Sequence, residues 1–288
     1  MGDEITDVSE IGYLGLPVGD LIDCSNFQQN EVVHCPAILK LDQVEWTAKN
    51  QAAIFQAYDG LASGFAKYTG TKQDSKKATF STVTKPADPY LLPLGFGAFC
   101  LDDIVRDPAK FQALGNDIGA CLAELIEILA ITEFAKSAVH TADDQSAHGI
   151  SLNLWITSCK NFGKFQRRNK SAIVHPDVFA KIKSLAGTYN VAGTDATIIS
   201  GEISKFAGCT LYQSNHCDVT DDVYTTYIAL DAAYQYGLPQ DVDLKEKSER
   251  GTLERYLDAS ISYVDYTPKA IGGVKRVIEL KHLLEEPA

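Results

Sequence analysis

A helical repeat of apolar residues between Asp107 and Val139 is the strongest pattern in the chain. Apolar side chains recur every three or four positions, at Phe111, Leu114, Ile118, Leu122, Leu125 and Leu129. This spacing places them on one face of an α-helix, and Asp107 followed by Pro108 is typical of a helix start. A helix that reached Val139 would be about 48 Å long, so we expect a long flat partner, most simply a β-sheet, to pack along it.

The stretch KSAIVHPDVFAKIKSLAG, residues 170–187, predicts a buried strand that turns into an amphipathic helix. Pro176 suits the first position of a helix, and Asp177 places a carboxylate near the positive end of the helix dipole. Gly187 suits the helix end, and the apolar face comprises Val178, Phe179, Ile182 and Leu185. The corner explains His175 without a chemical role, so we expect a hydrogen-bonded or exposed imidazole there.

The first hundred residues combine an arm with a hairpin. Residues 1–45 are interrupted by glycine and proline and predict an extended arm. A helix-like pattern follows from Val44 to Ala66. The segment Lys67–Lys85 predicts a long β-hairpin with a solvated tip, because its last residues alternate between polar and apolar.

The second half of the chain is predicted to be mostly β-structure. After a break at residues 143–145, SLNLWITSCKNFG predicts a helix capped by Gly163. From Val191 onward, strand-forming residues dominate. The segment ALDAAYQYG is compatible with either a strand or a helix, and the final GGVKRVIEL predicts a strand after a glycine turn.

Composition and charge narrow the class of protein. Hydrophobic residues make up 45% of the 288 residues and charged residues 22%, which is typical of a globular protein. A net charge of −12 argues against general binding of nucleic acids or anionic membranes, although a local basic patch is compatible with it. The chain has no run of 18 apolar residues, which argues against a membrane span, and its first residues lack the features of a signal peptide.

Lysines gather in the predicted hairpin of this acidic chain. Only Asp74 opposes their charge within the segment, and the lysines are Lys67, Lys72, Lys76, Lys77 and Lys85. A polar hairpin of this length is unusual inside a compact monomer. It is therefore either a surface loop or, as we expect, an arm that reaches a neighbouring subunit.

Two histidine–cysteine neighbours are the candidates for chemistry. His34-Cys35 and His216-Cys217 each place a potential base beside a thiol. Adjacent residues of a strand point to opposite faces, so neither pair forms a dyad with itself. A Cys–His pair assembled across the fold, or a metal site formed by all four residues, stays open as an alternative.

The other polar clusters predict structural roles. We expect His140 and His148 to face solvent, and Asp143-Asp144 and Asp221-Asp222 to be solvated turn residues. The seven cysteines include no CxxC pair and predict reduced, mostly buried thiols. No phosphate-binding loop, G-x-S-x-G or H-E-x-x-H motif occurs, so we expect no enzymatic activity, no cofactor and no metal.

The succession of these segments resembles the major capsid proteins of tailed double-stranded DNA bacteriophages, which have the HK97 fold. DIVRDPAKFQALGNDIGACLAELIEILAITEFAKSA resembles the long spine helix of that family, preceded by TFSTV and PLGFG as the return from an extended loop. LNLWITSCKNFG and SAIVHPDVFAKIKSL resemble the helix, strand and corner of its axial domain. GEISKFAGCTLYQSN, YIALDAAYQYG and YVDYTPKAIGGVKRVI resemble its later strands. The resemblance covers roughly Val44 to Leu280.

The resemblance implies an α+β fold with an N-terminal arm, an extended β-hairpin loop, a long spine helix, and peripheral and axial domains. We assign residues 1–45 to the arm and 46–149 to the extended loop and spine helix of the peripheral domain. Residues 150–262 are assigned to the axial domain, and 263–288 to C-terminal strands that return to the peripheral domain.

The resemblance also implies a function. The chain would be a structural subunit that self-assembles, as hexamers and pentamers, into an icosahedral capsid enclosing the phage genome. Portal, scaffolding and decoration proteins are the implied partners, with packaged DNA held non-specifically at the inner face and no membrane. The implied location is the virion, after assembly in the host cytoplasm. We expect contacts between subunits at Lys72, Lys76, Lys77 and Phe80.

Two alternatives remain at this point. An encapsulin-type nanocompartment shell protein has the same fold and binds a cargo peptide instead of packaging a genome. A cytosolic α+β enzyme with a Cys–His site assembled across the fold would form a small discrete oligomer and lose activity on thiol alkylation.

Overall fold

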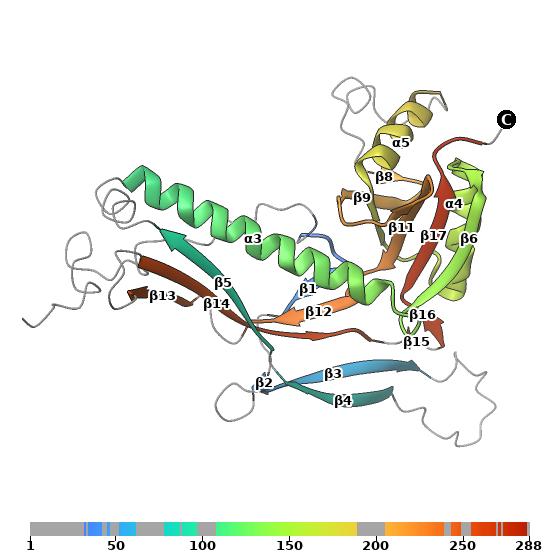
Figure 1. Ribbon diagram of the computed structural model, residues 1–288. Helices are drawn as coiled ribbons and strands as arrows, with labels where there is room; N and C mark the ends of the chain where they lie inside the picture. Colours follow the sequence, from blue (N-terminus) through green and yellow to red (C-terminus); the bar gives the residue numbers. More distant parts are fainter. Residues whose placement is uncertain are drawn as a thin grey trace, which may run out of the picture.

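Two β-sheets share one long helix, α3 (Pro108–Phe134), as Figure 1 shows. The computed structural model describes residues 32, 34–41, 45–46, 52–61, 78–86, 88–96, 108–188, 205–238, 243–248, 255–268, 270–271 and 273–286. Helices and strands both contribute to the core, and the α+β class predicted from the sequence is confirmed.

The first sheet lies along α3 and is the flat partner that the length of the helix predicted (Figure 1). Its strand order is β1-β12-β14-β13, with β5 also paired to β14. The strands are β1 (Ile38–Lys40), β5 (Asp88–Phe96), β12 (Tyr234–Gly237), β13 (Asp243–Ser248) and β14 (Arg255–Tyr266). The segment ALDAAYQYG therefore contains a strand, preceded by a turn in which Ala232 has a φ of 54°.

The buried face of α3 follows a four-residue repeat. One buried row comprises Ile118, Leu122, Ile126, Ala130 and Phe134, and the neighbouring buried row comprises Ala123, Glu127 and Ile131. The predicted face lies one residue earlier in its second half, at Leu125 and Leu129, which are half-buried. The helix ends at Phe134 instead of Val139, so its length is about 40 Å. Residues 135–139 form turns that lead into the next strand.

The second sheet has seven strands in the order β6-β17-β11-β7-β9-β8, with β10 paired to β11. The strands are β6 (His140–Gly149), β7 (Lys170–Val174), β8 (Lys205–Phe206), β9 (Cys209–Gln213), β10 (Val219–Thr220), β11 (Val223–Leu230) and β17 (Val277–Leu283). On one face lie the helices α4 (Leu152–Cys159), the 3₁₀-helix η4 (Lys160–Phe165) and α5 (Pro176–Thr188). The other face packs on the end of α3 and on residues 32–38.

The strand–helix corner is confirmed. Strand β7 is buried along its length and α5 begins at Pro176. Val178 and Ile182 are fully buried against the sheet, whereas Phe179 and Leu185 are partly buried. The helix continues one residue past Gly187 to Thr188.

The second strand of the predicted hairpin is confirmed, and residues 67–77 lie outside the described part of the chain. The helix predicted from Val44 to Ala66 is wrong. This segment forms β2 (Glu45–Trp46) and β3 (Ala52–Leu61), and β3 pairs antiparallel with β4 (Ala78–Pro86). Along β3, Ala53 and Phe55 are buried and their neighbours are half-exposed, which is the two-residue period of a strand. Alanine-rich sequence suits a helix equally well, and packing on another strand decides the outcome.

The break predicted at residues 143–145 is also wrong, because β6 passes through it and pairs parallel with β17. The segment is polar because β6 is an edge strand of its sheet. Two of its backbone amides bond to carboxylates of the chain itself. Ser146 N donates to Asp144 at 3.1 Å and Gly149 N to Glu286 at 3.2 Å.

A small strand pair completes the fold and connects the two sheets along the chain. Strands β15 (Ala270–Ile271) and β16 (Val274–Lys275) flank a turn in which Gly273 has a φ of 83°, as the glycine turn predicted. The chain then enters β17, which lies in the same sheet as β6 and β7. The division of the chain into peripheral and axial domains stays a prediction.

Phe134 is expected to be a major contributor to stability. Its ring is fully buried, 6.2 Å from that of Tyr227 in one sheet and 6.4 Å from that of Tyr234 in the other. Because Phe134→Ala removes this contact, it should lower the free energy of unfolding by about 3–5 kcal/mol. Urea titration measures this, with the exposed Ile128→Ala as control; equal losses for both variants would contradict the shared core.

His282 should make stability depend on pH. Its buried Nδ1 donates to Leu283 O at 3.0 Å, and its Nε2 lies 3.0 Å from the hydroxyl oxygen of Thr226. Burial lowers the pKa of His282 below its ordinary 6.5. The unfolded chain therefore binds a proton that the folded chain excludes, and stability falls as the pH drops below about 6.5.

This decline should be shallower in His282→Gln than in the wild type when urea unfolding is compared on both sides of that pH. The matched control is His148→Gln, because His148 is exposed. A decline unchanged by His282→Gln would contradict the assignment.

Candidate functional site

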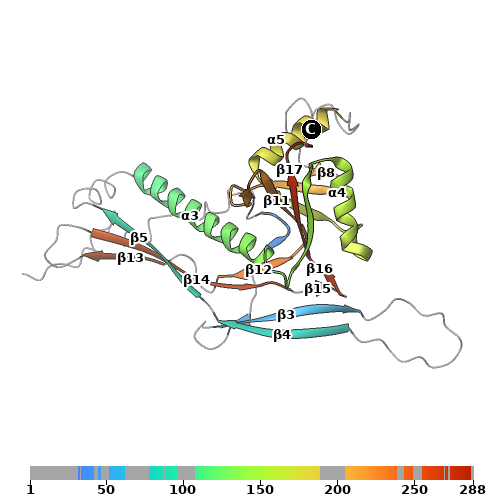
Figure 2. The same cartoon turned by 45° about the vertical axis from the view of Figure 1, so that its right-hand side comes forward.

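The root of the β3–β4 hairpin is built into the body of the protein. Ala53 and Phe55 of β3 form a buried cluster with Val264 of β14. The ring of Phe55 stacks on that of Tyr266, with 5.3 Å between ring centres. Because this cluster fixes the direction of the hairpin, the strands leave the body on the side of β14 opposite α3 (Figure 2).

The residues for which subunit contacts are predicted lie, along the sequence, in β4 or between β3 and β4. Phe80 lies in β4, opposite Tyr58 of β3. Lys72, Lys76 and Lys77 lie outside the described residues. Sequence reasoning missed the root cluster, although the alternating Ala53 and Phe55 were a signal for it.

A network of tyrosines and acids lies beside the hairpin root. The Tyr234 hydroxyl is 2.6 Å from that of Tyr263 and donates to Asp265 Oδ2 at 3.0 Å. Burial raises the pKa of the Asp265 carboxyl, while the Tyr234 hydrogen bond and the charges of Lys85 and Lys136 oppose that rise. The network therefore gives the buried carboxylate and phenol groups hydrogen-bond partners inside the protein.

His175 is a structural residue of the corner. Its Nδ1 accepts from Asp177 N at 3.3 Å, and its ring lies 5.4 Å from that of Tyr224. The Tyr224 hydroxyl donates to Asp177 Oδ2 at 3.2 Å. These contacts fasten the start of α5 to β11 and leave His175 as the hydrogen-bonded imidazole that the sequence predicted.

The two histidine–cysteine neighbours do not form a reactive pair. Both lie in turns or bends, not in the strands on which the sequence argument rested. Burial raises the pKa of Cys35 to about 11 and that of Cys217 to about 12. His34 is exposed, whereas His216 pairs with Glu124 at 3.3 Å. Within the part of the chain that is described, no three of the residue types His, Cys, Asp and Glu group as a metal site.

His140 differs from the prediction, whereas His148 and Asp221-Asp222 match it. The side chain of His140 is only 9% exposed, and its Nε2 lies 2.8 Å from the Glu279 carboxylate, because β6 and β17 pair side by side. His148 is exposed, as predicted. Asp221 and Asp222 both have positive φ in the two-residue turn between β10 and β11, a conformation that aspartate tolerates.

Two buried thiols meet beneath α4. Cys159 and Cys209 are hydrogen-bonded to each other, and Trp155 Nε1 donates to Cys209 Sγ at 3.3 Å. This hydrogen bond and burial raise the pKa of Cys159. The pair lies in the core cluster with Trp155 and Phe206, so its role is packing.

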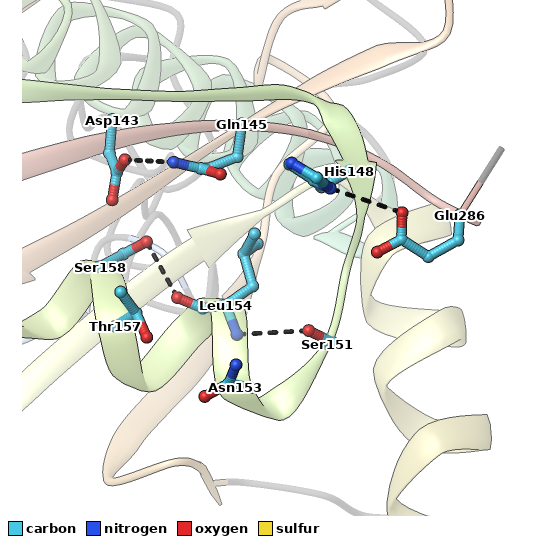
Figure 3. A pocket seen from close by; sticks show the side chains of 9 residues that line it. All are labelled: Asp143, Gln145, His148, Ser151, Asn153, Leu154, Thr157, Ser158 and Glu286. Atoms are coloured by element: carbon cyan, nitrogen blue, oxygen red, sulfur yellow. Dashed lines mark hydrogen bonds and ion pairs between the residues drawn. The ribbon is translucent and has the colours of Figure 1, made fainter.

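A shallow polar pocket lies between β6, the start of α4 and the C-terminal segment (Figure 3). Its volume is about 250 Å³, and it is lined by Asp143, Gln145, His148, Ser151, Asn153, Leu154, Thr157, Ser158 and Glu286. Asp143 accepts from Gln145, and Ser151 caps α4 by accepting from Leu154 N at 3.2 Å. Its only histidine, His148, is 3.7 Å from Glu286, and both are exposed. The pocket thus lacks a nucleophile positioned beside a base.

The described helices include none long and apolar enough to cross a membrane. No protein-family model matches the sequence, and no curated protein matches it. Solved structures do match the fold. The capsid of the cyanophage P-SCSP1u is 12% identical, with 85% of this chain and 86% of that chain covered and a TM-score of 0.57.

Two further structures show the same arrangement. The capsid of a native GTA particle is 10% identical, covers 90% of this chain and 91% of its own, and gives a TM-score of 0.59. A virus-like particle from Pyrococcus furiosus is 13% identical, covers 91% and 97%, and gives 0.54. The chain has the HK97 capsid fold. The fold predicted from the succession of segments is therefore confirmed.

The exposure of each cysteine predicts which thiols react in the folded protein. Cys121 is exposed, whereas Cys35, Cys159, Cys209 and Cys217 are buried. With a pKa of about 11, Cys35 is a thiolate in only about one molecule in a thousand near pH 8. Iodoacetamide should therefore modify Cys121 in the native protein and leave these four buried thiols largely unmodified.

Peptide mass spectrometry measures the modification at each cysteine. Labelling in guanidinium chloride is the control, in which every thiol should react. Rapid native labelling of Cys35 or Cys217 would contradict this result and favour the Cys–His enzyme.

Proposed function

We propose that the chain is a structural subunit that self-assembles into the icosahedral capsid of a tailed double-stranded DNA bacteriophage. The observation that carries this proposal is the capsid fold, shared over 85–90% of the chain with the capsids of a cyanophage and a GTA particle. Hexamers and pentamers of the chain itself are the primary partners. Portal, scaffolding and decoration proteins and packaged DNA follow from the same proposal, as do the virion location and assembly in the host cytoplasm.

The rooted hairpin supports self-assembly. A two-stranded hairpin alone is marginally stable in water, and among the side chains that the structure describes, β3–β4 packs on the rest of the protein through a small cluster around Phe55. A neighbouring subunit can cover the rest of its surface. A shell that uses many such contacts gains a large interface while the free subunit stays soluble.

The contacts of the candidate residues support a non-enzymatic role. His175, His140 and His216 each bond to a nearby acid or backbone group, and the buried thiols have raised pKa values. We therefore expect these groups to stabilise the fold and not to take part in a reaction.

A nanocompartment shell is the second candidate, favoured by the likeness to the virus-like particle from Pyrococcus furiosus. The two candidates differ in what the particles hold. A phage capsid encloses double-stranded DNA when it is made with its packaging partners, whereas a nanocompartment encloses a cargo protein.

Closed particles are the expected result when the chain is expressed and examined by size-exclusion chromatography and negative-stain microscopy. The double variant Lys76→Glu/Lys77→Glu should reduce particle yield, because it reverses the charge that we expect to meet acidic surface on the next subunit. The matched control, Lys183→Glu/Lys205→Glu, reverses two exposed lysines of the seven-stranded sheet and α5. A compact monomer for the wild type would overturn the proposed function, and unchanged assembly of the hairpin variant would overturn the hairpin contact alone.

A further inference from the structure

A dense basic segment lies between α4 and β7 of this acidic protein. Residues 160–170, KNFGKFQRRNK, hold five of the 26 lysines and arginines and no acidic residue. Four of the five, Lys160, Lys164, Arg167 and Arg168, are exposed. We call residues 160–170 the basic turn.

The basic turn is held in one conformation by its own contacts. The fifth cation, Lys170, is buried and donates from Nζ to Gln166 O at 2.7 Å and to Arg168 O at 3.0 Å. Arg168 and Lys164 lie against the Phe165 ring, at 4.6 Å and 5.1 Å from its centre. Phe165 itself packs against the core beneath α4 and α5. The cations are therefore presented by a rigid base, which lowers the entropy cost of binding an anion.

The exposed cations of the basic turn have little negative charge near them in the described part of the chain. None of the four forms an ion pair there. Burial raises the pKa of Asp231, and the charge of the nearby Arg168 opposes that rise. Asp143 also lies near, but it accepts from Asn161 Nδ2 at 3.4 Å. Like charges held together in this way favour an anionic partner.

The first residues of the sequence form a segment of the opposite charge. Residues 1–31 contain seven acidic residues and no lysine or arginine, and the acids are Asp3, Glu4, Asp7, Glu10, Asp20, Asp23 and Glu31. This stretch accounts for much of the net charge of −12.

The described residues that directly follow this acidic segment lie close to the basic turn. Pro36 O accepts from Ala232 N at 2.8 Å, and the charge of the adjacent Asp231 acts on both Cys35 and Arg168. Val32 is already buried in the same core as Cys35. Thirty-one residues can span up to about 100 Å, so length does not limit the contact. A short tether also gives an effective concentration in the millimolar range.

We propose that the acidic segment of residues 1–31 docks on the basic turn of the same chain. The pairing is electrostatic, between the carboxylates of the segment and the cations of Lys160, Lys164, Arg167 and Arg168. Free nucleic acid is the less favoured partner, because the whole protein repels a polyanion while the tethered segment is always near. This contact is independent of assembly and exists in the single chain.

Carbodiimide cross-linking of the full-length chain tests the proposal, because it joins carboxylates to lysine amines in direct contact. The wild-type gene is expressed together with a gene carrying Ile11→Val and Ile156→Val, so that any oligomer contains both chains. Mass spectrometry should find residues 1–31 linked to Lys160. Linked peptides from one chain carry both markers or neither, whereas links between copies are mixed.

Substituting the two arginines reverses their charge and keeps the lysines that the carbodiimide reaction requires. Arg167→Glu/Arg168→Glu should reduce the yield of these links about five-fold or more, and so should about 0.5 M NaCl with the wild type. The control Lys183→Glu/Lys205→Glu should leave the yield within about two-fold of wild type. Circular dichroism confirms that each variant folds, and the salt arm tests the wild type if a variant does not.

Several outcomes would overturn the proposal. Absence of links from residues 1–31 to the basic turn would do so, as would predominantly mixed markers, which assign the contact to a second copy. Binding of duplex DNA with a Kd below about 10 μM, lost in the arginine variant, would assign the basic turn to nucleic acid. Failure to form particles would count against the proposed capsid function and leave the single-chain links unaffected.

Discussion

The structure depends on one apolar contact, the packing of the C-terminal half of α3 into a core that belongs to both sheets. Phe134 lies between Tyr227 of the seven-stranded sheet and Tyr234 of the sheet beneath the helix. The same core takes in Val32, Cys35, Ala37 and Ile38 from the N-terminal side of the chain. Because protein interiors are close-packed, such a core permits few relative positions of the two sheets. Side-chain packing at the C-terminal end of α3 therefore fixes how the two sheets are placed, and with them the strand β14 on which the hairpin packs.

The sequence predicts this frame where a single local pattern decides the structure. The spacing of Leu122 and its apolar neighbours identified α3, and Pro176 with Asp177 identified the start of α5. The sheet along α3 followed from length alone. The succession of segments then identified a capsid fold that sequence matching does not detect, since the three similar solved structures described above are only 10–13% identical. Fold recognition thus rested on order and periodicity, which persist when individual residues differ.

The sequence fails where a partner distant along the chain decides the structure. Strand β3 resembled a helix because alanine suits both, and only its packing on Val264 and Tyr266 makes it a strand. Strand β6 resembled a loop because an edge strand tolerates polar residues, and its pairing with β17 joins segments more than 130 residues apart. The same pairing hides His140 against Glu279. The sequence did not predict the pocket near Ser151 either, because Glu286, far away along the chain, forms one wall of it.

Polar side chains of the core and of the strand–helix corner satisfy hydrogen bonds that folding requires. His282 joins β11 to the end of β17, His175 joins α5 to β11, and Tyr234 provides a partner for Asp265. A buried polar group without a partner is costly, so each of these contacts has a structural reason of its own.

Each copy carries a charge of −12, and like-charged copies repel at long range. Close contact between copies is therefore most favourable where basic residues interrupt the acidic surface, and the chain concentrates five lysines within residues 67–85. The distribution of lysines and arginines along the chain is thus a stronger guide to its contacts than any histidine or cysteine.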